Sequence, residues 1–474
     1  MNCHNPLRRE FWLGDFDPRP LALFRIAIGL VVLHDLVDFT RDFGAFLTDD
    51  GMLPRRVPRE WFTWSVFDLA GRLPAVAAVY TCGVLAIIAF TLGLYTRLAT
   101  VLSWVWLVSL HNRNSFITDG GDMLVGILFF WSIFADLGAC WSLDAHRSGP
   151  RARVPAFGLR LLQAHVAILY YATARLKFAQ GWLHGVAVFQ VLQLEGFVRP
   201  PGAWIGTQPV LCAIGTYVIL AAEAAFPICA FAPIAIRPMR AVALFLGLFI
   251  QLGIISTMRV GIFQGAMLAS CALFILPEWF DRAQEWLARR EMPWLQPFER
   301  SADRPPKQVP PWRLTLYGAL AVQFVIAVWG FFGERRIPLP RFVRNARTLL
   351  SIEQPADLFA TVHAIPHWSA PGLLTDGTPV EILSVAAPGA RPLGPAIRFS
   401  RWSKFRFKDR GERPLPWPTL GPYLCKEYDR QVGPALGGPK LASFDVVNDE
   451  TAPRLPDQEA SAPRRRTMWH QQCE

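Results

Sequence analysis

Long runs of apolar residues, separated by short polar segments, occupy the first two thirds of the chain. A helix that crosses the hydrocarbon core of a bilayer needs roughly 20 mainly apolar residues, and nine runs reach or approach that length. We predict spanning helices at residues 20–39, 74–95, 97–112, 121–138, 154–175, 209–231, 239–257, 259–277 and 313–332. The third and eighth runs are short and begin at tight turns, so the predicted count is about nine. The pattern predicts an all-α polytopic transmembrane bundle.

The pattern changes after residue 332. Apolar and polar positions alternate in PVEILSV and ASFDVV, with proline and glycine between them, which predicts the strands of a small β-rich domain. The end of the chain, ETAPRLPDQEASAPRRRTMWHQQCE, is too polar to bury much surface and predicts a loose tail. We expect a transmembrane domain at residues 1–332, with a proline-rich linker at 296–312, and a β-rich domain with a loose tail at 333–474.

Residues 181–204, between the fifth and sixth runs, have a pattern of their own. Apolar residues alternate with polar ones at Trp182, Val186, Phe189, Leu192 and Leu194. This alternation is typical of an amphipathic segment that lies at the membrane surface or re-enters the bilayer. We favour a helix on the surface.

Composition supports a membrane protein. The chain is 52% hydrophobic and has 18 Trp and 34 Phe, which excludes an ordinary soluble domain. Its net charge of +11 comes largely from arginines in short loops beside the apolar runs, where they set orientation, so we infer no nucleic-acid partner. The loop cations place the N-terminus in the cytoplasm and residues 333–474 outside it. We expect an integral membrane protein with this orientation, and the family resemblance described below implies a bacterial inner membrane.

The cysteines predict one crosslink and no metal site. Cys425 and Cys473 fall on the expected oxidising side and can form a disulfide that holds the tail, although two free thiols are the alternative. The sequence contains no CxxC pair and no Cys/His cluster with zinc-like spacing.

Charged residues fall inside the apolar runs, where an ionised group costs a few kcal/mol or more, and we single out Arg25, Asp35 and Glu223. Arg25 and Asp35 are ten residues apart on one helix, about 15 Å along its axis, so they cannot pair directly. Glu223 lies near the middle of its run and should face the bundle interior, either protonated or paired with a basic group. Two interpretations stay open: ion pairs that hold helices in register, or a functional pocket.

Lys177, in YYATARLKFAQGW, is the only lysine among the first 306 residues of a chain with 42 arginines and six lysines. A lysine at a helix end can extend to the lipid headgroups, but arginine does this equally well. Only lysine can lose its proton and act as a general base. We therefore single out Lys177 as a candidate catalytic base. His165, twelve residues earlier, need not share its site.

The chain also resembles a protein family through nine ordered motifs. They are PLALFRIAIGLVVLHDL with TDDG after it, GLYTRLATVLSW, SLHNRNSFITDGGD, CWSLD, YYATARLKFAQGW, STMRVGIFQGAMLASCALFILPEW, LLTDGTPVEIL, RWSKF and YLCKEYD. This set resembles the HTTM group, membrane proteins similar to vitamin K-dependent γ-carboxylase. The resemblance implies that Lys177 is the base that deprotonates reduced vitamin K, with Trp182 in the tryptophan position that follows it.

Further positions match the family and are expected to line a pocket or support the scaffold. They are Arg25, Asp35, Arg97, Trp141 and Glu223. The implied chemistry is lyase-like: a reduced quinone, oxygen and carbon dioxide act together to carboxylate glutamate in a secreted peptide. The alternatives are a non-catalytic protein that assists maturation or export of a secreted peptide, and a transporter.

The sequence departs from the family at three positions. Ala139 and Gln251 stand where family members carry histidine, and His165 replaces a common glutamine. The missing histidines argue against the complete carboxylase reaction, whereas the retained Lys177 keeps a base-assisted reaction open.

Overall fold

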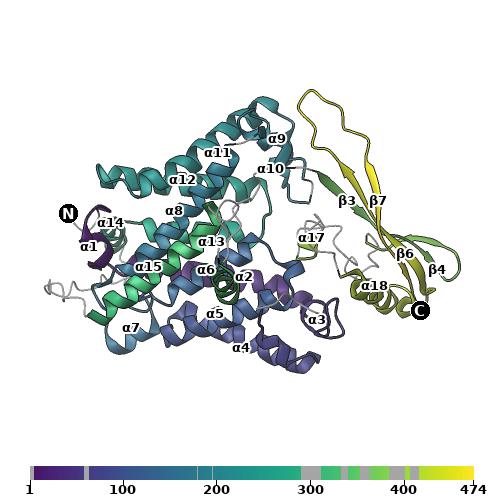
Figure 1. Cartoon of the computed structure of the whole chain (residues 1–474), viewed down its shortest axis with the longest axis horizontal. Coiled ribbons are helices and arrows are strands. Elements are labelled where there is room, and N and C mark those ends of the chain that lie inside the picture. Colours follow the sequence, from purple (N-terminus) through teal and green to yellow (C-terminus); the bar gives the residue numbers. More distant parts are fainter. Residues whose placement is uncertain are drawn as a thin grey trace.

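The computed structural model describes residues 5–57, 63–178, 180–194, 196–289, 311–332, 340–352, 362, 364–383, 401–405 and 416–473. A helical bundle makes up most of the molecule, and a twisted sheet lies at one end of it (Figure 1). The helix α1 (Arg9–Leu13) lies at the opposite end of the bundle from the sheet.

The longer helices of the bundle are α2 (Arg19–Arg41), α4 (Leu73–Leu92), α5 (Thr96–Arg113), α6 (Gly120–Ser132), α8 (Phe157–Lys177), α11 (Pro209–Ala230), α12 (Ile236–Thr257), α13 (Ile262–Ser270), α14 (Pro277–Ala288) and α15 (Pro311–Phe332). Shorter helices are α3 (Phe43–Leu47), α7 (Leu143–Ser148), α9 (Ala187–Val191), α10 (Pro200–Gly206), α16 (Arg341–Leu350) and α17 (Arg401–Phe405). A two-residue ladder joins β1 (Asp15–Phe16) to β2 (Val154–Pro155).

A helix occupies each of the nine predicted runs, but their lengths and compositions differ. Within the described residues, four helices are long and apolar enough to cross a bilayer: α2, α4, α11 and α12. They expose large apolar side chains such as Leu85, Ile214 and Phe245, as expected of surfaces that face lipid. These features indicate an integral membrane protein, while the count of nine spans stays a prediction.

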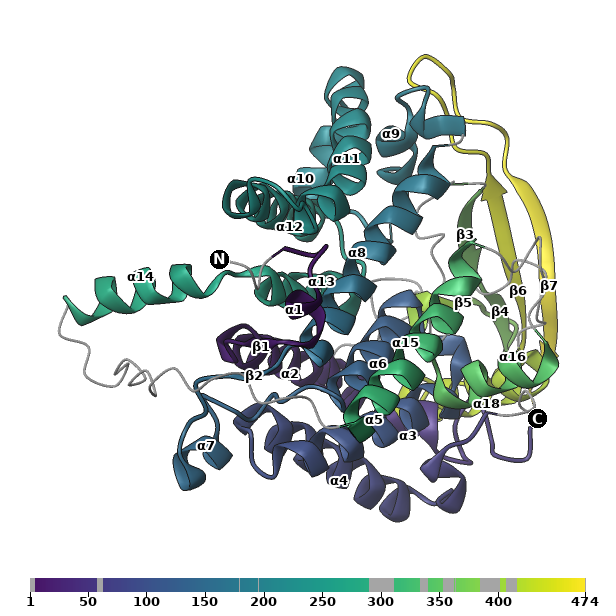
Figure 2. The same cartoon turned by 60° about the vertical axis from the view of Figure 1, so that its left-hand side comes forward.

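The eighth predicted run is not one straight helix. Residues 262–274 and 277–286 meet at an angle of 92° and would form a fifth span only if taken together. Pro277 stands at the break, where its missing N–H and its ring prevent a continuous helix. As a result α14 projects from the side of the bundle (Figure 2).

Two connecting segments of the bundle contact the C-terminal region. The side chain of Thr419 donates to the carbonyl oxygen of Met52 at 2.9 Å, and the Trp64 indole N–H donates to Leu349 at 2.7 Å. Gln193 exchanges two hydrogen bonds with the backbone of Arg454, each 3.0 Å long. The loop between α3 and α4 and the segment after α9 therefore contact the C-terminal region.

Residues 181–204 do not form the single surface helix that we favoured. They contain α9, the start of α10 and a 3-10 turn at Gln180–Trp182, with Gly185 at a φ of 75° between them. Trp182 and Phe189 are buried, and Trp182 packs with Leu220 of α11. The glycines and prolines of this stretch interrupt a helix, and its apolar side chains divide between buried ones such as Phe189 and exposed ones such as Trp204.

The C-terminal sheet is antiparallel and is built around one long strand. Its strands are β3 (Ile365–Ser369), β4 (Pro371–Leu374), β5 (Pro379–Glu381), β6 (Leu441–Thr451) and β7 (Arg464–Gln472). β6 pairs with β3 and β4 along one edge and with β7 along the other, and β5 extends the sheet from β4. Helix α18 (Trp417–Gln431) packs on it.

The end of the chain differs from the loose tail that its polarity predicts, because residues 464–472 form the strand β7. The strand buries little, yet its backbone pairs with β6 from Gln472 back to Arg464. Opposite charges face each other across the ladder at Glu450 and Arg464, and the Nδ1 atom of His470 lies 2.7 Å from an oxygen of Asp445. Strand pairing uses backbone groups, so a polar segment can pair without a buried face.

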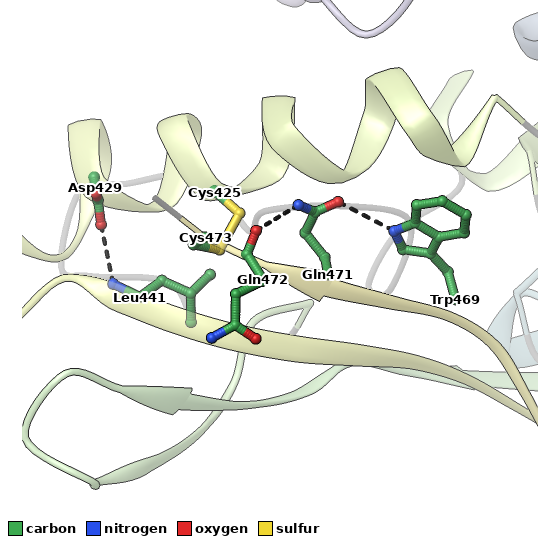
Figure 3. The surroundings of a disulfide bond; sticks show 7 residues. All are labelled: Cys425, Asp429, Leu441, Trp469, Gln471, Gln472 and Cys473. Carbon is green, nitrogen blue, oxygen red and sulfur yellow. Dashed lines mark hydrogen bonds between the residues drawn. A yellow bond between two sulfur atoms is a disulfide. The ribbon is translucent and has the colours of Figure 1, made fainter.

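Cys425 and Cys473, the two cysteines expected to pair, form a disulfide in the structure (Figure 3). Cys425 lies on α18 and Cys473 directly follows β7, with their Cα atoms 5.7 Å apart. The bond fastens the edge strand β7 to the helix that covers the sheet.

Replacing Cys473 with serine is expected to lower the stability of the β6–β7 pairing by about 2–4 kcal/mol, because a crosslink between residues 48 apart restricts the unfolded chain. The check is amide hydrogen exchange of β7, which should become faster. Cys82→Ser, at an exposed free cysteine, is the matched control and should leave that exchange unchanged. Equal exchange in both variants would contradict the prediction.

Candidate functional site

Lys177 is the last residue of α8, and its side chain turns into the bundle toward α11. Its Nζ atom lies 2.5 Å from Oε1 of Glu223, and both side chains are 7% exposed. Glu223 stands near the middle of α11, where a lone carboxylate would be costly. The structure thus joins the two residues that sequence analysis singled out separately.

Trp182 completes the surroundings of the lysine. The Nζ atom of Lys177 lies 4.7 Å from the centroid of the Trp182 ring, close enough for a cation–π interaction. Trp182 is buried in the turn that follows α8, where it packs against Leu220 and Ala187. A carboxylate and an aromatic face therefore take the place of water around the ammonium group.

The second carboxylate oxygen of Glu223 has unused hydrogen-bonding capacity. Oε2 is buried, and within the described part of the chain no donor lies within hydrogen-bonding distance of it. A buried acceptor without a partner costs roughly 1–3 kcal/mol. Such an atom could accept a hydrogen bond from a hydroxyl group of a ligand.

Polar contacts continue along the same face of α8. Tyr170 lies seven residues, or two turns, before Lys177, so the two side chains project from the same face. The Nε2 group of Gln251 on α12 donates to the Tyr170 hydroxyl at 2.9 Å, and the Tyr170 ring lies 4.2 Å from that of Phe226. Gln251, one of the family departures, thus supports Tyr170.

This arrangement permits a proton transfer from Lys177 to Glu223 that leaves the net charge of the pair unchanged. If the proton of Lys177 passes to Oε1 of Glu223, an ion pair becomes a neutral amine and a neutral acid, which a low-dielectric interior tolerates well. The amine then has a free lone pair and can accept a proton from a nearby hydroxyl. An amine formed in this way would be a general base.

Two other predicted residues do not join this site. His165 is buried three turns earlier on α8, with its ring edge-on to Phe324 of α15 at 6.3 Å. Arg97 is 80% exposed at the start of α5 and pairs with Asp136 at 3.2 Å. It lines a cavity of about 870 Å³ at the end of the bundle away from the sheet, together with Ala139.

Arg25 also acts at that distant end. Its guanidinium donates to the carbonyl oxygens of Leu137, at 2.8 Å, and Trp141, and so holds the loop after α6. Arg25 does not contact Asp35, in agreement with their separation along the helix. We assign Arg25 a structural role.

The position of Ala139 bears on the missing family histidine. The loop that contains Ala139 packs near the start of α8, where a Cβ on Gly158 would lie 2.5 Å from the carbonyl oxygen of Phe134. Lys177 is nineteen residues further along, about 28 Å away on a straight helix. The replacement of histidine by Ala139 therefore removes no group from the surroundings of Lys177.

Asp35 belongs to a second charged cluster, which we call the Asp122 network. It consists of Asp35, His111, Asp119, Asp122, Arg401 and Lys404. Arg401 donates to Asp35 and, at 3.0 Å, to Asp122, while the Lys404 ammonium lies 3.0 Å from Asp122. The network connects α2, α5 and α6 of the bundle to α17 of the C-terminal region.

Local structure positions both the acidic and the basic side chains of the Asp122 network. Asp119 caps α6, and the Asp122 carboxylate accepts a hydrogen bond from the Asp119 N–H, which fixes both carboxylates in TDGGD. Arg401 and Lys404 are three residues apart in RWSKF and share one face of α17. Burial disfavours both cations, but the surrounding aspartates outweigh it and raise the pKa of Arg401 and of Lys404.

Sequence reasoning found Asp35 but missed Asp122, Arg401 and Lys404. Both TDGGD and RWSKF belong to the ordered motifs, and the D-x-x-D spacing of a capping box was readable in the first. The pairing itself was not readable, because 279 residues separate Asp122 from Arg401.

A cavity of about 560 Å³ adjoins the network, between α2, α12, α13 and α17. Asp35, Arg401 and Lys404 form part of its wall, and Arg199 and Arg259 form another part. Across the described ranges, no three His, Cys, Asp or Glu side chains are grouped so that they could hold a metal ion.

Comparison with known proteins adds one match. The family model described as the HTTM domain matches residues 14–279, which include Lys177, Trp182 and Glu223. No solved structure matches the chain.

Proposed function

The chain belongs to the HTTM family, and from this premise we propose that it is a membrane enzyme similar to vitamin K-dependent γ-carboxylase, with the Lys177–Glu223 pair as its acid–base group. The observation that carries the proposal is the buried 2.5 Å contact between Lys177 and Glu223, beside an oxygen of Glu223 that lacks a donor. A buried oxygen without a hydrogen-bond donor lowers stability, so it would not benefit a pair whose role is only structural.

The chain's own residues carry the proton steps. Glu223 takes the proton of Lys177 at Oε1, and the amine that results accepts a proton from a substrate hydroxyl. The ammonium then faces the new oxyanion and stabilises it electrostatically. Trp182 shields the pair from water and holds the lysine in place through its ring.

A reduced quinone fits this site as the source of the hydroxyl. Glu223 Oε2 would accept a hydrogen bond from it, Lys177 would hold or accept its proton, and the apolar cluster of Trp182, Ala187 and Leu220 would contact its ring. When bound and oxidised by oxygen, a hydroquinone supplies a base strong enough to take the γ proton of glutamate before carbon dioxide adds. We propose a glutamate-containing secreted peptide as the substrate.

The test measures carboxylation of peptides by the whole protein in membranes, supplied with reduced quinone, oxygen and carbon dioxide. We expect glutamate residues to gain the mass of one carbon dioxide, and Lys177→Arg to reduce the rate by at least about 100-fold, the usual contribution of a positioned base. Lys440→Arg, at an exposed lysine, is the matched control and should keep the wild-type rate.

Two outcomes would overturn the proposal. Carboxylation that persists in Lys177→Arg would exclude the lysine as the base. If no peptide is modified and quinol is not oxidised, while a secreted peptide still needs the protein for export, the non-catalytic alternative holds instead.

A further inference from the structure

Two short segments far apart in sequence form a small antiparallel ladder at the end of the bundle that faces the sheet. Val198 and Met258 are bridge partners. The N–H of Arg199 donates to the carbonyl oxygen of Thr257 at 2.8 Å, and that of Arg259 donates to Phe197 at 2.6 Å. The backbone on both sides is therefore fixed.

This ladder places two arginines on one face. Side chains alternate between faces along a strand, so Arg199 and Arg259 project opposite to Val198 and Met258. They occupy diagonal positions, for which the Cα separation is roughly 7–8 Å. Two guanidinium groups at that spacing can both donate to one phosphate.

Both arginines line the cavity of about 560 Å³, and neither has an acidic partner among the residues that the structure describes. Arg199 uses Nε to bond the carbonyl oxygen of Met258 at 3.1 Å, which leaves its terminal nitrogens for a ligand. Arg259 is exposed. The positive charge of this pair is therefore available.

The other charged groups of the cavity wall already have partners. Asp35 accepts from Arg401, and Lys404 lies 2.9 Å from Asp119 and 3.0 Å from Asp122. Asp38 pairs with Arg41 at 3.4 Å. Besides these, His34 is the remaining titratable side chain in the wall. A ligand thus meets an excess of positive charge at Arg199 and Arg259.

Apart from Gln264, the remainder of the wall is apolar and continues along the helix α2. It includes Leu30, Val31, Ile255, Ile262 and Gly265 from α2, α12 and α13. Leu30 precedes Asp38 by eight residues, or about 12 Å along α2, and is 57% exposed on the outside of a helix long and apolar enough to span the bilayer. Along α2 the wall is therefore charged near Asp35 and Asp38 and apolar near Leu30.

We propose that this cavity binds an anionic phospholipid, with Arg199 and Arg259 on the phosphate and the aliphatic wall against an acyl chain. A bilayer supplies this class of ligand at high concentration, and arginine pairs recognise phosphate through paired N–H donors. Bound lipid would join the loop before α10 to the end of α12, beside the Asp122 network. The site is separate from the Lys177–Glu223 pair.

Native mass spectrometry of the full-length protein tests this site with phosphatidylglycerol and with phosphatidylcholine of the same acyl chains. We expect at least about fivefold tighter binding of phosphatidylglycerol, and at least a tenfold loss of its affinity in R199Q/R259Q, since two charge-assisted contacts are removed. The control R56Q/R72Q removes two exposed arginines outside the cavity wall and should stay within about twofold of wild type.

Several results would overturn the proposal. Equal binding of the two lipids by the wild-type protein would do so without any variant, even if R199Q/R259Q failed to fold. Wild-type affinity in a folded R199Q/R259Q would do so as well. Inorganic phosphate at millimolar concentration is expected to leave the lipid bound, and complete displacement would identify a free-phosphate site in place of a lipid site.

Discussion

Replacing Glu223 with leucine is expected to destabilise the folded protein by about 3–5 kcal/mol, because Lys177 then keeps a buried charge without its counter-ion. The loss should be visible as a large fall in the thermal unfolding temperature of the purified protein, followed by tryptophan fluorescence. If the lysine side chain moved into water, it would also lose its contact with the Trp182 ring.

The double replacement Lys177→Met with Glu223→Leu is expected to recover most of that loss. Removal of both charges leaves an apolar pair of similar volume, and such pairs are often as stable as the buried ion pair that they replace. Carboxylation should stay absent, so stability and activity separate. This separation identifies a site that is retained for its chemistry.

Glu278→Leu provides the matched control for this experiment. Glu278 pairs with Arg237 at 3.2 Å, but the two side chains are 36% and 65% exposed, and such surface pairs contribute at most about 1 kcal/mol. A fall in stability no larger for Glu223→Leu than for Glu278→Leu would mean that the buried pair does not hold α8 against α11.

Replacing Asp122 with leucine is expected to release α17 from the bundle. Asp122 lies 3.0 Å from both Arg401 and Lys404, so its removal leaves two buried cations with too little negative charge, at a cost of about 3–5 kcal/mol. Both cations are buried in the folded protein, so trypsin cannot cut after them. Cleavage at Arg401 and Lys404 should become faster by a factor of about 200 to 5,000.

Limited proteolysis with identification of each cut by mass spectrometry measures this effect. Asp38→Leu is the control, because Asp38 and Arg41 are both at least half exposed and form a weak pair at 3.4 Å. If cuts after Arg401 and Lys404 appear at the same rate in both variants, the Asp122 network does not hold the C-terminal region in place.

Much of the fold was predictable from local pattern. Apolar runs predicted where helices lie, and the alternation in ASFDVV predicted part of β6. The bend of 92° before Pro277 and the strand β7 were not predicted. In both cases a backbone feature, and not the average polarity of the segment, determined the structure. Pro277 lacks an N–H and breaks the helix. The open edge of β6 can pair with a strand even when that strand is polar.

The candidate site was predictable only in its parts. The rarity of lysine singled out Lys177, and the cost of a charge at membrane depth singled out Glu223 and its need for a basic partner. Neither argument could match the two, because 46 residues that include α9 and α10 separate them. The same holds for Asp35, whose partner Arg401 is 366 residues away.

The sequence by itself determined the class of protein, its family and the residues that could not stay unpaired, because hydropathy, ordered motifs and desolvation costs belong to each segment locally. Tertiary structure decided which charges meet. Packing of α8 on α11 brought Glu223 to Lys177, and docking of α17 brought Arg401 to Asp35. Contacts between remote segments depend on which helices pack against each other, and the local sequence pattern does not contain that information.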